Sequence, residues 1–174
     1  MLILIFLLFG VVMGCNVLPP IKCDEGWTPV RRILGGWCAR IGELTILGGE
    51  ECSDMNGNLS GVESNNELNI YMSMLRESNI TSAYVGGFVK LDECLCEGKL
   101  CNITETCQIP SVWSWNDEFV VGTEMLNTLT PQFVSENKYA ANIAVSTENN
   151  IGLIDSLDTT SITLSYFFCG KKSN

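Results

Sequence analysis

Nine cysteines and the absence of histidine restrict the chemistry that this 174-residue chain can perform. Four of the cysteines lie close together in sequence: Cys94, Cys96, Cys101 and Cys107. Their spacing lacks the paired two-residue knuckles of a zinc ribbon, and no histidine is present to complete a mixed zinc site. Without histidine, no Ser-His or Cys-His pair is available to activate a nucleophile. We therefore expect disulfides in place of a metal site, and a protein that is not an enzyme.

The first residues indicate an oxidising compartment. Residues 1–13 are apolar and uncharged, and the small residue Gly14 follows, as in a secretory signal peptide, although the usual basic residue before the apolar core is missing. Cleavage after Gly14 would retain Cys15, whereas cleavage after Cys15 would remove it. Residues 15–22 contain two prolines and are predicted to be an extended lead-in. No later stretch is long and apolar enough to span a membrane, so we expect a secreted, extracellular protein.

The length of the chain suits one domain with a single core. The net charge of −10 argues against nucleic acid as a partner, because phosphate binding needs a basic surface. Acidity is also compatible with calcium sites, but most often it only keeps a secreted protein soluble.

The stretch Glu50–Leu75 combines the signals of a helix end, a turn, a strand and a second helix. Leu44–Asp54 is predicted to be a helix that carries Cys52. Met55–Asn58 is predicted to be the turn that ends it, since Asn and Gly tolerate a left-handed backbone. Leu59–Val62 then alternates apolar and small residues as a short strand would.

The second helix is predicted to begin with a capping box, in which Ser64 and Glu67 each satisfy a free backbone N–H of the other's turn. Its apolar face is predicted to contain four residues: Leu68, Tyr71, Met74 and Leu75.

Three further segments have the composition of strands or core segments: Tyr84–Phe88, Trp113–Asp117 and Ile162–Cys169. The glycines of the first, a predicted central strand, indicate close approach of another backbone. The third is predicted to be the closing strand. Near the start of the domain, Cys23 and Cys38 lie on either side of alternating residues. A basic turn at Arg31-Arg32 separates them, which suits a hairpin pinned across its two strands.

The order of these features resembles the C-type lectin-like domain, and within it the secreted branch found in nematodes. The resemblance rests on a cysteine-bearing helix followed by Leu59-Ser60-Gly61, and on Tyr84-Val85-Gly86-Gly87 where the family has W-I-G-L. Three further motifs agree with the resemblance: W-S-W-N-D at Trp113–Asp117, Cys-Gly-Lys-Lys at Cys169–Lys172, and C-x2-G-W at Cys23–Trp27. The last of these is typical of long-form members, which have an extra N-terminal hairpin. The resemblance covers residues 23–171. It implies one α+β domain in which two helices flank small antiparallel β-sheets, with an N-terminal hairpin extension and a long irregular loop region.

The resemblance also implies two disulfides. Cys23 would bond to Cys38 in the hairpin, and Cys52 of the first helix would bond to Cys169 of the last strand. Closing a loop of more than 100 residues could stabilise the fold by about 4 kcal/mol through the unfolded state.

The insertion Leu91–Cys107 is predicted to be a surface loop closed by two local disulfides among its four cysteines. Four cysteines allow three pairings, and the sequence does not select one. We expect a nested pairing, in which Cys94 bonds to Cys107 and Cys96 bonds to Cys101. Cys15, if retained, is then left for an intermolecular disulfide.

The long-loop part of the chain departs from the family pattern. The usual second core disulfide has no counterpart, because no cysteine lies between Cys107 and Cys169. We therefore expect the segment Met125–Ser161 to be less constrained than in other members.

In sugar-binding members of the family, calcium is held by an E-P-N or Q-P-D tripeptide, a downstream Glu, and the Asn and Asp of W-N-D. The equivalent positions here carry a degenerate set of ligand candidates: Thr130, Gln132, Glu136 and Asp155. Thr130 offers a hydroxyl where a carboxylate belongs, and Ile154 replaces the Asn of W-N-D. Two carboxylates and one amide do not make a calcium cage, so we expect no cofactor.

Three glycosylation sequons begin at Asn58, Asn79 and Asn102. We expect Asn79 and Asn102 to be used more reliably than Asn58, which borders a predicted buried strand.

The expected function is that of a secreted recognition protein that has lost the calcium-dependent sugar mechanism. It would bind an extracellular protein or another ligand through the loop surface Met125–Asn150, which carries Phe133 and Tyr139. The alternative is a carbohydrate-binding lectin of the innate-defence type, with a relocated or calcium-independent glycan site. A secreted hydrolase is a third class, for which no catalytic constellation is visible.

Overall fold

The computed structural model describes residues 18–43, 51–89, 95–96, 99–100, 113–122, 124–128, 130–133, 140–148, 150–155 and 165–174. The expected signal peptide, Cys15 and most of the insertion Leu91–Cys107 lie outside these residues, as do Asn102, Glu136 and Tyr139.

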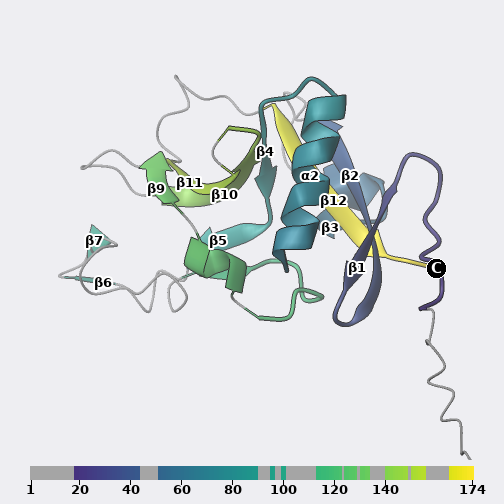
Figure 1. Cartoon of the computed structure of the whole chain (residues 1–174). Coiled ribbons are helices and arrows are strands. Elements are labelled where there is room, and N and C mark those ends of the chain that lie inside the picture. The colour runs from purple at the N-terminus through teal and green to yellow at the C-terminus, as the bar shows by residue number, and fades with distance from the viewer. Residues whose placement is uncertain are drawn as a thin grey trace, which may run out of the picture.

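One eight-stranded sheet runs through the domain (Figure 1). Its spatial order is β1 (Thr28–Arg32), β2 (Gly35–Glu43), β12 (Tyr166–Lys172), β4 (Ser82–Val85), β10 (Ala140–Ser146), β11 (Asn150–Asp155) and β9 (Thr130–Phe133). The short strand β3 (Asn58–Leu59) also pairs with β12. The neighbours are antiparallel except β12 with β4 and β11 with β9. The last strand of the chain thus joins the N-terminal hairpin to the middle of the sheet.

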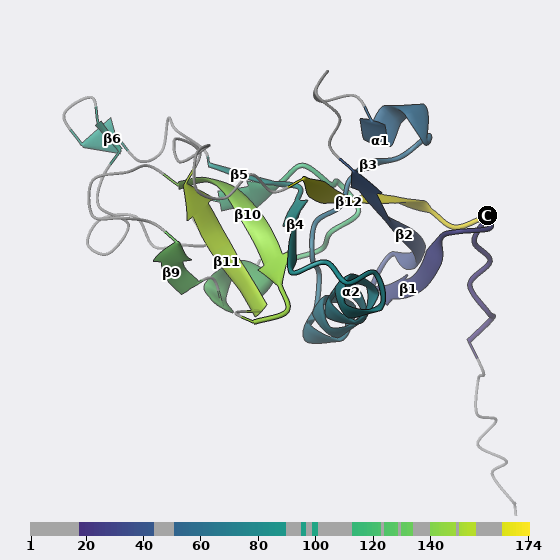
Figure 2. The ribbon, with the colours of Figure 1, turned by 90° about the horizontal axis from the view of Figure 1, so that it is seen from above.

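In the described part of the chain, two α-helices lie on opposite faces of this sheet, as Figure 2 shows from above: α1 (Glu51–Asp54) and α2 (Asn65–Glu77). A 3-10 helix, η2 (Glu124–Thr128), precedes β9. Two small sheets pair β5 (Gly87–Val89) with β8 (Trp113–Trp115), and β6 (Leu95–Cys96) with β7 (Lys99–Leu100). None of the described helices has the length and apolar composition needed to cross a membrane.

The ends of the helices follow the predicted turn chemistry. Asn56, with φ 55°, ends α1, and the next N–H, that of Gly57, donates to the carbonyl of Cys52 at 2.8 Å. The predicted turn is therefore confirmed for Met55–Gly57, whereas its last residue, Asn58, belongs to a strand, β3. The predicted start of the first helix, residues 44–50, lies outside the described residues.

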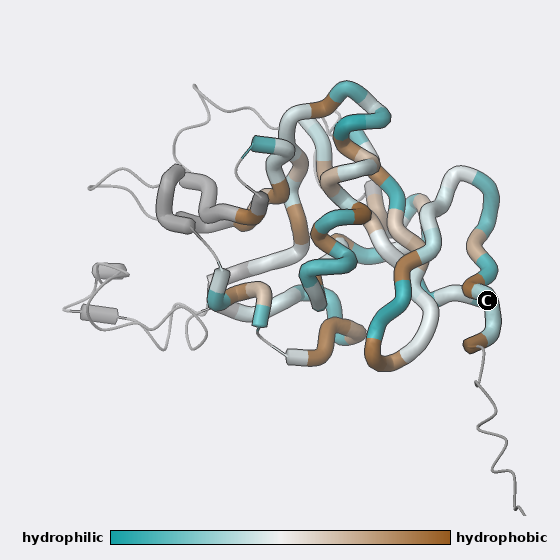
Figure 3. The backbone as a smooth tube through the Cα atoms, in the orientation of Figure 1, coloured by the Kyte–Doolittle hydropathy of each residue, from teal (hydrophilic) through white to brown (hydrophobic). Residues whose placement is uncertain are grey.

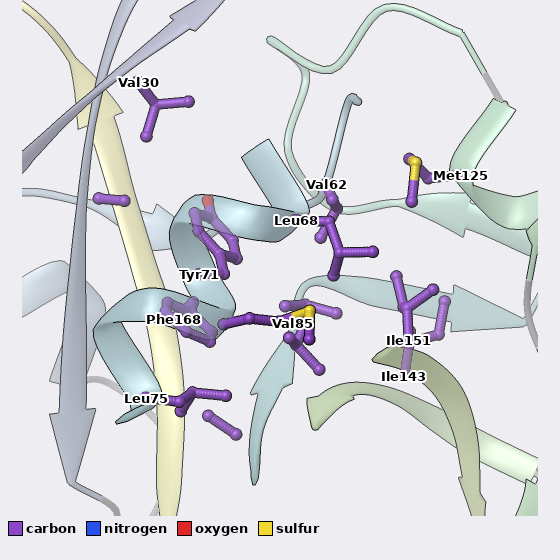
Figure 4. Close-up of a cluster of buried hydrophobic side chains, with 14 of the residues drawn as sticks. Val30, Val62, Leu68, Tyr71, Leu75, Val85, Met125, Ile143, Ile151 and Phe168 are labelled. Atoms are coloured by element: carbon purple, nitrogen blue, oxygen red, sulfur yellow. The ribbon is translucent and has the colours of Figure 1, made fainter. Parts of the chain in front are cut away.

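The hydrophobic core joins α2 to both halves of the sheet, and side chains of η2 complete it (Figure 4). The rings of Tyr71 and Phe168 stack with their centroids 4.2 Å apart. The predicted apolar face of α2 is confirmed for Leu68, Tyr71 and Leu75, which are buried, whereas Met74 is only partly buried.

The predicted central strand Tyr84–Phe88 is in fact two strands, β4 and β5, which belong to different sheets. The break falls at Gly86, whose N–H donates to the carbonyl of Ser60 at 2.9 Å. The Gly86 carbonyl accepts from Asn116 at 2.6 Å. A Cβ at position 86 would lie 2.5 Å from the carbonyl oxygen of Leu59, so the predicted close approach of another backbone is confirmed.

The N-terminal hairpin forms with a different turn from the predicted one. Arg31 and Arg32 belong to β1, and Ile33-Leu34 make the turn, where they form an exposed apolar tip (Figure 3). Cys23 precedes β1, so its disulfide with Cys38 ties β2 to the lead-in segment and does not cross the hairpin.

Both disulfides implied by the resemblance, Cys23–Cys38 and Cys52–Cys169, are present. The second joins α1 to the closing strand, where Cys169 lies opposite Leu59 of β3. The strand predicted at Leu59–Val62 is observed one residue earlier and is shorter, as β3. The strand predicted at Ile162–Cys169 is observed later, as β12; residues 162–164 of the prediction lie outside the described part.

Candidate functional site

Three of the four candidate calcium ligands, Thr130, Gln132 and Asp155, lie on strands at one edge of the sheet, β9 and β11. In the parallel register of these strands, Thr130 lies opposite Gly152, and Phe133 lies opposite Ile154. The sheet therefore brings the strand that carries Thr130 and Gln132 beside the strand that ends at Asp155. Glu136 lies outside the described residues.

Buried apolar side chains anchor the segment that leads into this edge. Met125 and Leu126 of η2 are 2% and 0% exposed, and they pack in the main core with Ile143 of β10 and Ile151 of β11. The Thr128 hydroxyl donates to the Met125 carbonyl at 2.8 Å and closes the 3-10 helix just before β9. The segment expected to be loosely held is thus anchored by burial at Met125, Leu126, Ile143 and Ile151, and Met125 does not belong to a loop surface.

The described strands at this edge contain few residues of the types that bind calcium. Calcium takes six to eight oxygen ligands, with carboxylates foremost. The neighbouring strands β9 and β11 contain one hydroxyl residue, Thr130, two amide residues, Gln132 and Asn150, and one carboxylate residue, Asp155, while Ile154 has no side-chain oxygen. Among the described residues, no group of three or more carboxylate or cysteine side chains could hold a metal ion.

The most highly charged cluster of the described residues is instead buried between β1, α2 and the segment after β8. The guanidinium of Arg32 lies 2.7 Å from the Glu67 carboxylate and 2.6 Å from that of Asp117. It also donates to the Ser60 hydroxyl at 3.1 Å and to the Gly61 carbonyl at 3.0 Å. Because the side chains of the three ionic residues are at most 2% exposed, this cluster is closed to solvent.

Hydroxyl and indole groups extend the Arg32 cluster into the core. Ser60 Oγ accepts from Trp37 Nε1 at 2.8 Å and lies 2.7 Å from the Tyr71 hydroxyl. The Tyr71 hydroxyl donates to Glu67 at 2.9 Å. The guanidinium carbon of Arg32 also lies 4.1 Å from the centroid of the Trp37 ring. Each polar group of the cluster therefore has a partner within it.

The predicted capping box is only half present. Ser64 Oγ accepts from the Glu67 N–H at 3.2 Å, as expected. The Glu67 carboxylate does not return to the backbone of Ser64; it accepts from the Glu63 N–H at 2.7 Å and from Arg32. The buried guanidinium is the stronger partner, because a charged donor in a region of low dielectric attracts the carboxylate more than a neutral N–H does.

Glu63 connects two loops at the same end of the molecule. Its two carboxylate oxygens accept from the backbone N–H groups of Ile33, at 2.8 Å, and Val121, at 2.9 Å. The tip of the hairpin and the segment that follows Asp117 are therefore held side by side.

The electrostatics of the Arg32 cluster agree with a structural role. Burial raises the pKa of Glu67 above its ordinary value, and Arg32 opposes that shift. Burial also raises the pKa of Tyr71, and the neighbouring charge of Glu67 adds to the increase. The burial of these side chains and the hydrogen bonds among them indicate that the cluster supports the fold.

No protein-family profile and no curated protein sequence matches the chain. Among solved structures, it is similar to human lithostathine, with a TM-score of 0.55 and 15% identity over 87% of this chain and 100% of that one. It is similar to the carbohydrate-recognition domain of the human scavenger receptor C-type lectin, with a TM-score of 0.54 and 12% identity over 87% and 99%. It is also similar to a calcium-independent type II antifreeze protein, with a TM-score of 0.52 and 13% identity over 90% of this chain and 99% of that one. At these identities the similarity establishes the fold alone, and it confirms the predicted α+β class.

Proposed function

We propose that this chain, which has the C-type lectin-like fold, is a secreted, non-catalytic binding module that recognises its ligand without calcium. The observation that carries the proposal is the pairing of β9 with β11, which brings two ligand-poor segments together at the edge of the sheet.

The residue types on these strands leave too little charge for calcium. The affinity of a calcium site depends on the number of charged ligands and on the completeness of the cage. Thr130 supplies no charge, Ile154 supplies no oxygen, and the described part of the edge has only one carboxylate residue, Asp155.

Solved structures with the same fold are consistent with function in the absence of calcium. One is described as a calcium-independent type II antifreeze protein, with a TM-score of 0.52. Others are described as carbohydrate-recognition domains, among them that of cow CD23, studied in the presence of an oligosaccharide, with a TM-score of 0.51. An extracellular protein is our first choice of ligand, and a glycan bound without calcium is the second.

A glycan array probed with the purified secreted protein tests this proposal. The array is probed once with calcium and once with a chelator, and we expect no binding that the chelator abolishes. Binding that persists in chelator would favour a calcium-independent glycan ligand, and silence under both conditions would favour a protein ligand. Calcium-dependent glycan binding that is lost in the Asp155→Asn variant would contradict the proposal.

A further inference from the structure

We infer that Asn79 carries an N-linked glycan in the secreted protein, and that Asn58 is modified less completely although its sequon is equally intact. The structure distinguishes the two sequons by the surroundings of their hydroxyl residues, Thr81 and Ser60. This inference is independent of the ligand proposed above.

Asn79 lies at the exposed end of α2, where it has the left-handed φ of 55°. The helix end is closed by backbone bonds alone: the N–H groups of Asn79 and Ile80 donate to the carbonyls of Arg76, at 3.1 Å, and Leu75, at 2.9 Å. No described hydrogen bond uses the side-chain amide of Asn79. Both Asn79 and Thr81 are exposed, so an enzyme can reach the whole sequon.

Asn58 is also exposed, but its sequon is built into the sheet. It lies opposite Gly170 in the β3–β12 pair, and Ser60, the hydroxyl residue of its sequon, is 0% exposed. The Ser60 hydroxyl is bonded to Trp37, Tyr71 and Arg32. A transferase that must read this hydroxyl can act only before the Arg32 cluster closes, which shortens the time available at Asn58.

The modification is a group transfer from a lipid pyrophosphate-linked oligosaccharide. The amide nitrogen of Asn79 forms a bond to the anomeric carbon of the first sugar and loses one proton. The bond between that carbon and the pyrophosphate oxygen breaks, and the lipid pyrophosphate leaves with the electron pair.

A glycan at Asn79 would be attached at the opposite end of the β10–β11 hairpin from Asp155. The carbonyl of Thr81 accepts from the Thr147 N–H at 2.9 Å, which places the sequon beside the turn between β10 and β11. Asp155 pairs with Ala140 at the other end of that hairpin. Six residues of strand separate the two ends, roughly 20 Å at the rise of an extended chain.

Site occupancy can be measured on the full chain recovered from the medium of a secreting eukaryotic cell. Enzymatic deglycosylation in heavy-oxygen water converts each glycosylated Asn to a mass-tagged Asp, and peptide mass spectrometry then gives the occupied fraction at each sequon. We expect a higher fraction at Asn79 than at Asn58. An untagged Asn79, or an Asn58 fraction that equals or exceeds it, would overturn the inference.

Two variants at one exposed position provide the matched control. Thr81→Ala removes the sequon and keeps Asn79 at the helix end, whereas Thr81→Ser preserves the sequon. We expect the first variant to lose the gel-mobility shift of one glycan and the second to retain it. Equal mobility of the two variants before deglycosylation would overturn the inference, even if both fold normally.

Discussion

Replacement of Glu67 by alanine is expected to lower the free energy of unfolding by about 3–5 kcal/mol, because it removes one partner of a buried ion pair. Arg32 is 5% exposed and would keep only Asp117 as an anionic partner. The Tyr71 hydroxyl and the Glu63 N–H would also lose their common acceptor. The cost arises chiefly from the buried charge of Arg32, which loses one of its two carboxylate partners, and from the Glu63 N–H, which loses its acceptor.

Chemical denaturation of the purified variants measures this effect. Glu77→Ala is the matched control, since it makes the same change at an exposed position of the same helix, and we expect a change within about 0.5 kcal/mol. The Arg32→Met/Glu67→Ala double variant should lose less than the sum of the two single variants, because the two side chains interact directly. If Glu67→Ala lowers the free energy of unfolding no more than Glu77→Ala does, the Arg32 cluster does not stabilise the fold.

Removal of the Cys52–Cys169 disulfide with two alanines is expected to lower stability by about 5 kcal/mol. The bond closes a loop with a sequence separation of 117 residues, so its loss releases much conformational entropy into the unfolded chain. It also disconnects α1 from β12, which pairs with three other strands.

The Cys23–Cys38 disulfide is the internal comparison, with a separation of only 15 residues and an expected loss of about 3 kcal/mol. Thermal and chemical unfolding of the two double-alanine variants give both values. A greater loss from the shorter loop would mean that native packing around Cys38, and not loop closure, dominates the contribution of these bonds.

Local signals in the sequence were sufficient for the elements that depend on local contacts. Asn56 ends α1 in a left-handed conformation, as its turn residues predicted, and Leu68, Tyr71 and Leu75 form the buried face of α2 at helical spacing. The family pattern supplied the pairing of Cys52 with Cys169, which no local signal specifies.

The sequence did not reveal contacts between distant segments. Arg32 bonds to Asp117 across 85 residues, and nothing near either residue distinguishes a buried pair from two surface charges. The sequence therefore predicts a basic turn at Arg31-Arg32, and it predicts that the Glu67 carboxylate bonds to the backbone of Ser64. One signal for the burial of Arg32 is present in the sequence. In a strand, residues two positions apart point to the same face, so Arg32 lies on the same face as the buried Val30.

The candidate site shows the same division. The residue types at Thr130 and Ile154 predicted a weak calcium site, but their strands meet only through the parallel pairing of β9 with β11. The anchoring of this edge by Met125 and Leu126 was not predicted, because η2 is too short to show a helical period in the sequence.

A calorimetric titration of the full-length secreted protein with calcium tests the central claim most directly. Extracellular calcium modules bind with dissociation constants of about 0.1–1 mM, so the titration should extend to about 10 mM. The absence of a saturable heat is the result that this account predicts. A saturable single-site isotherm in that range, abolished by Asp155→Asn but not by Glu77→Ala, would show that β9 and β11 hold a working calcium site and would contradict it.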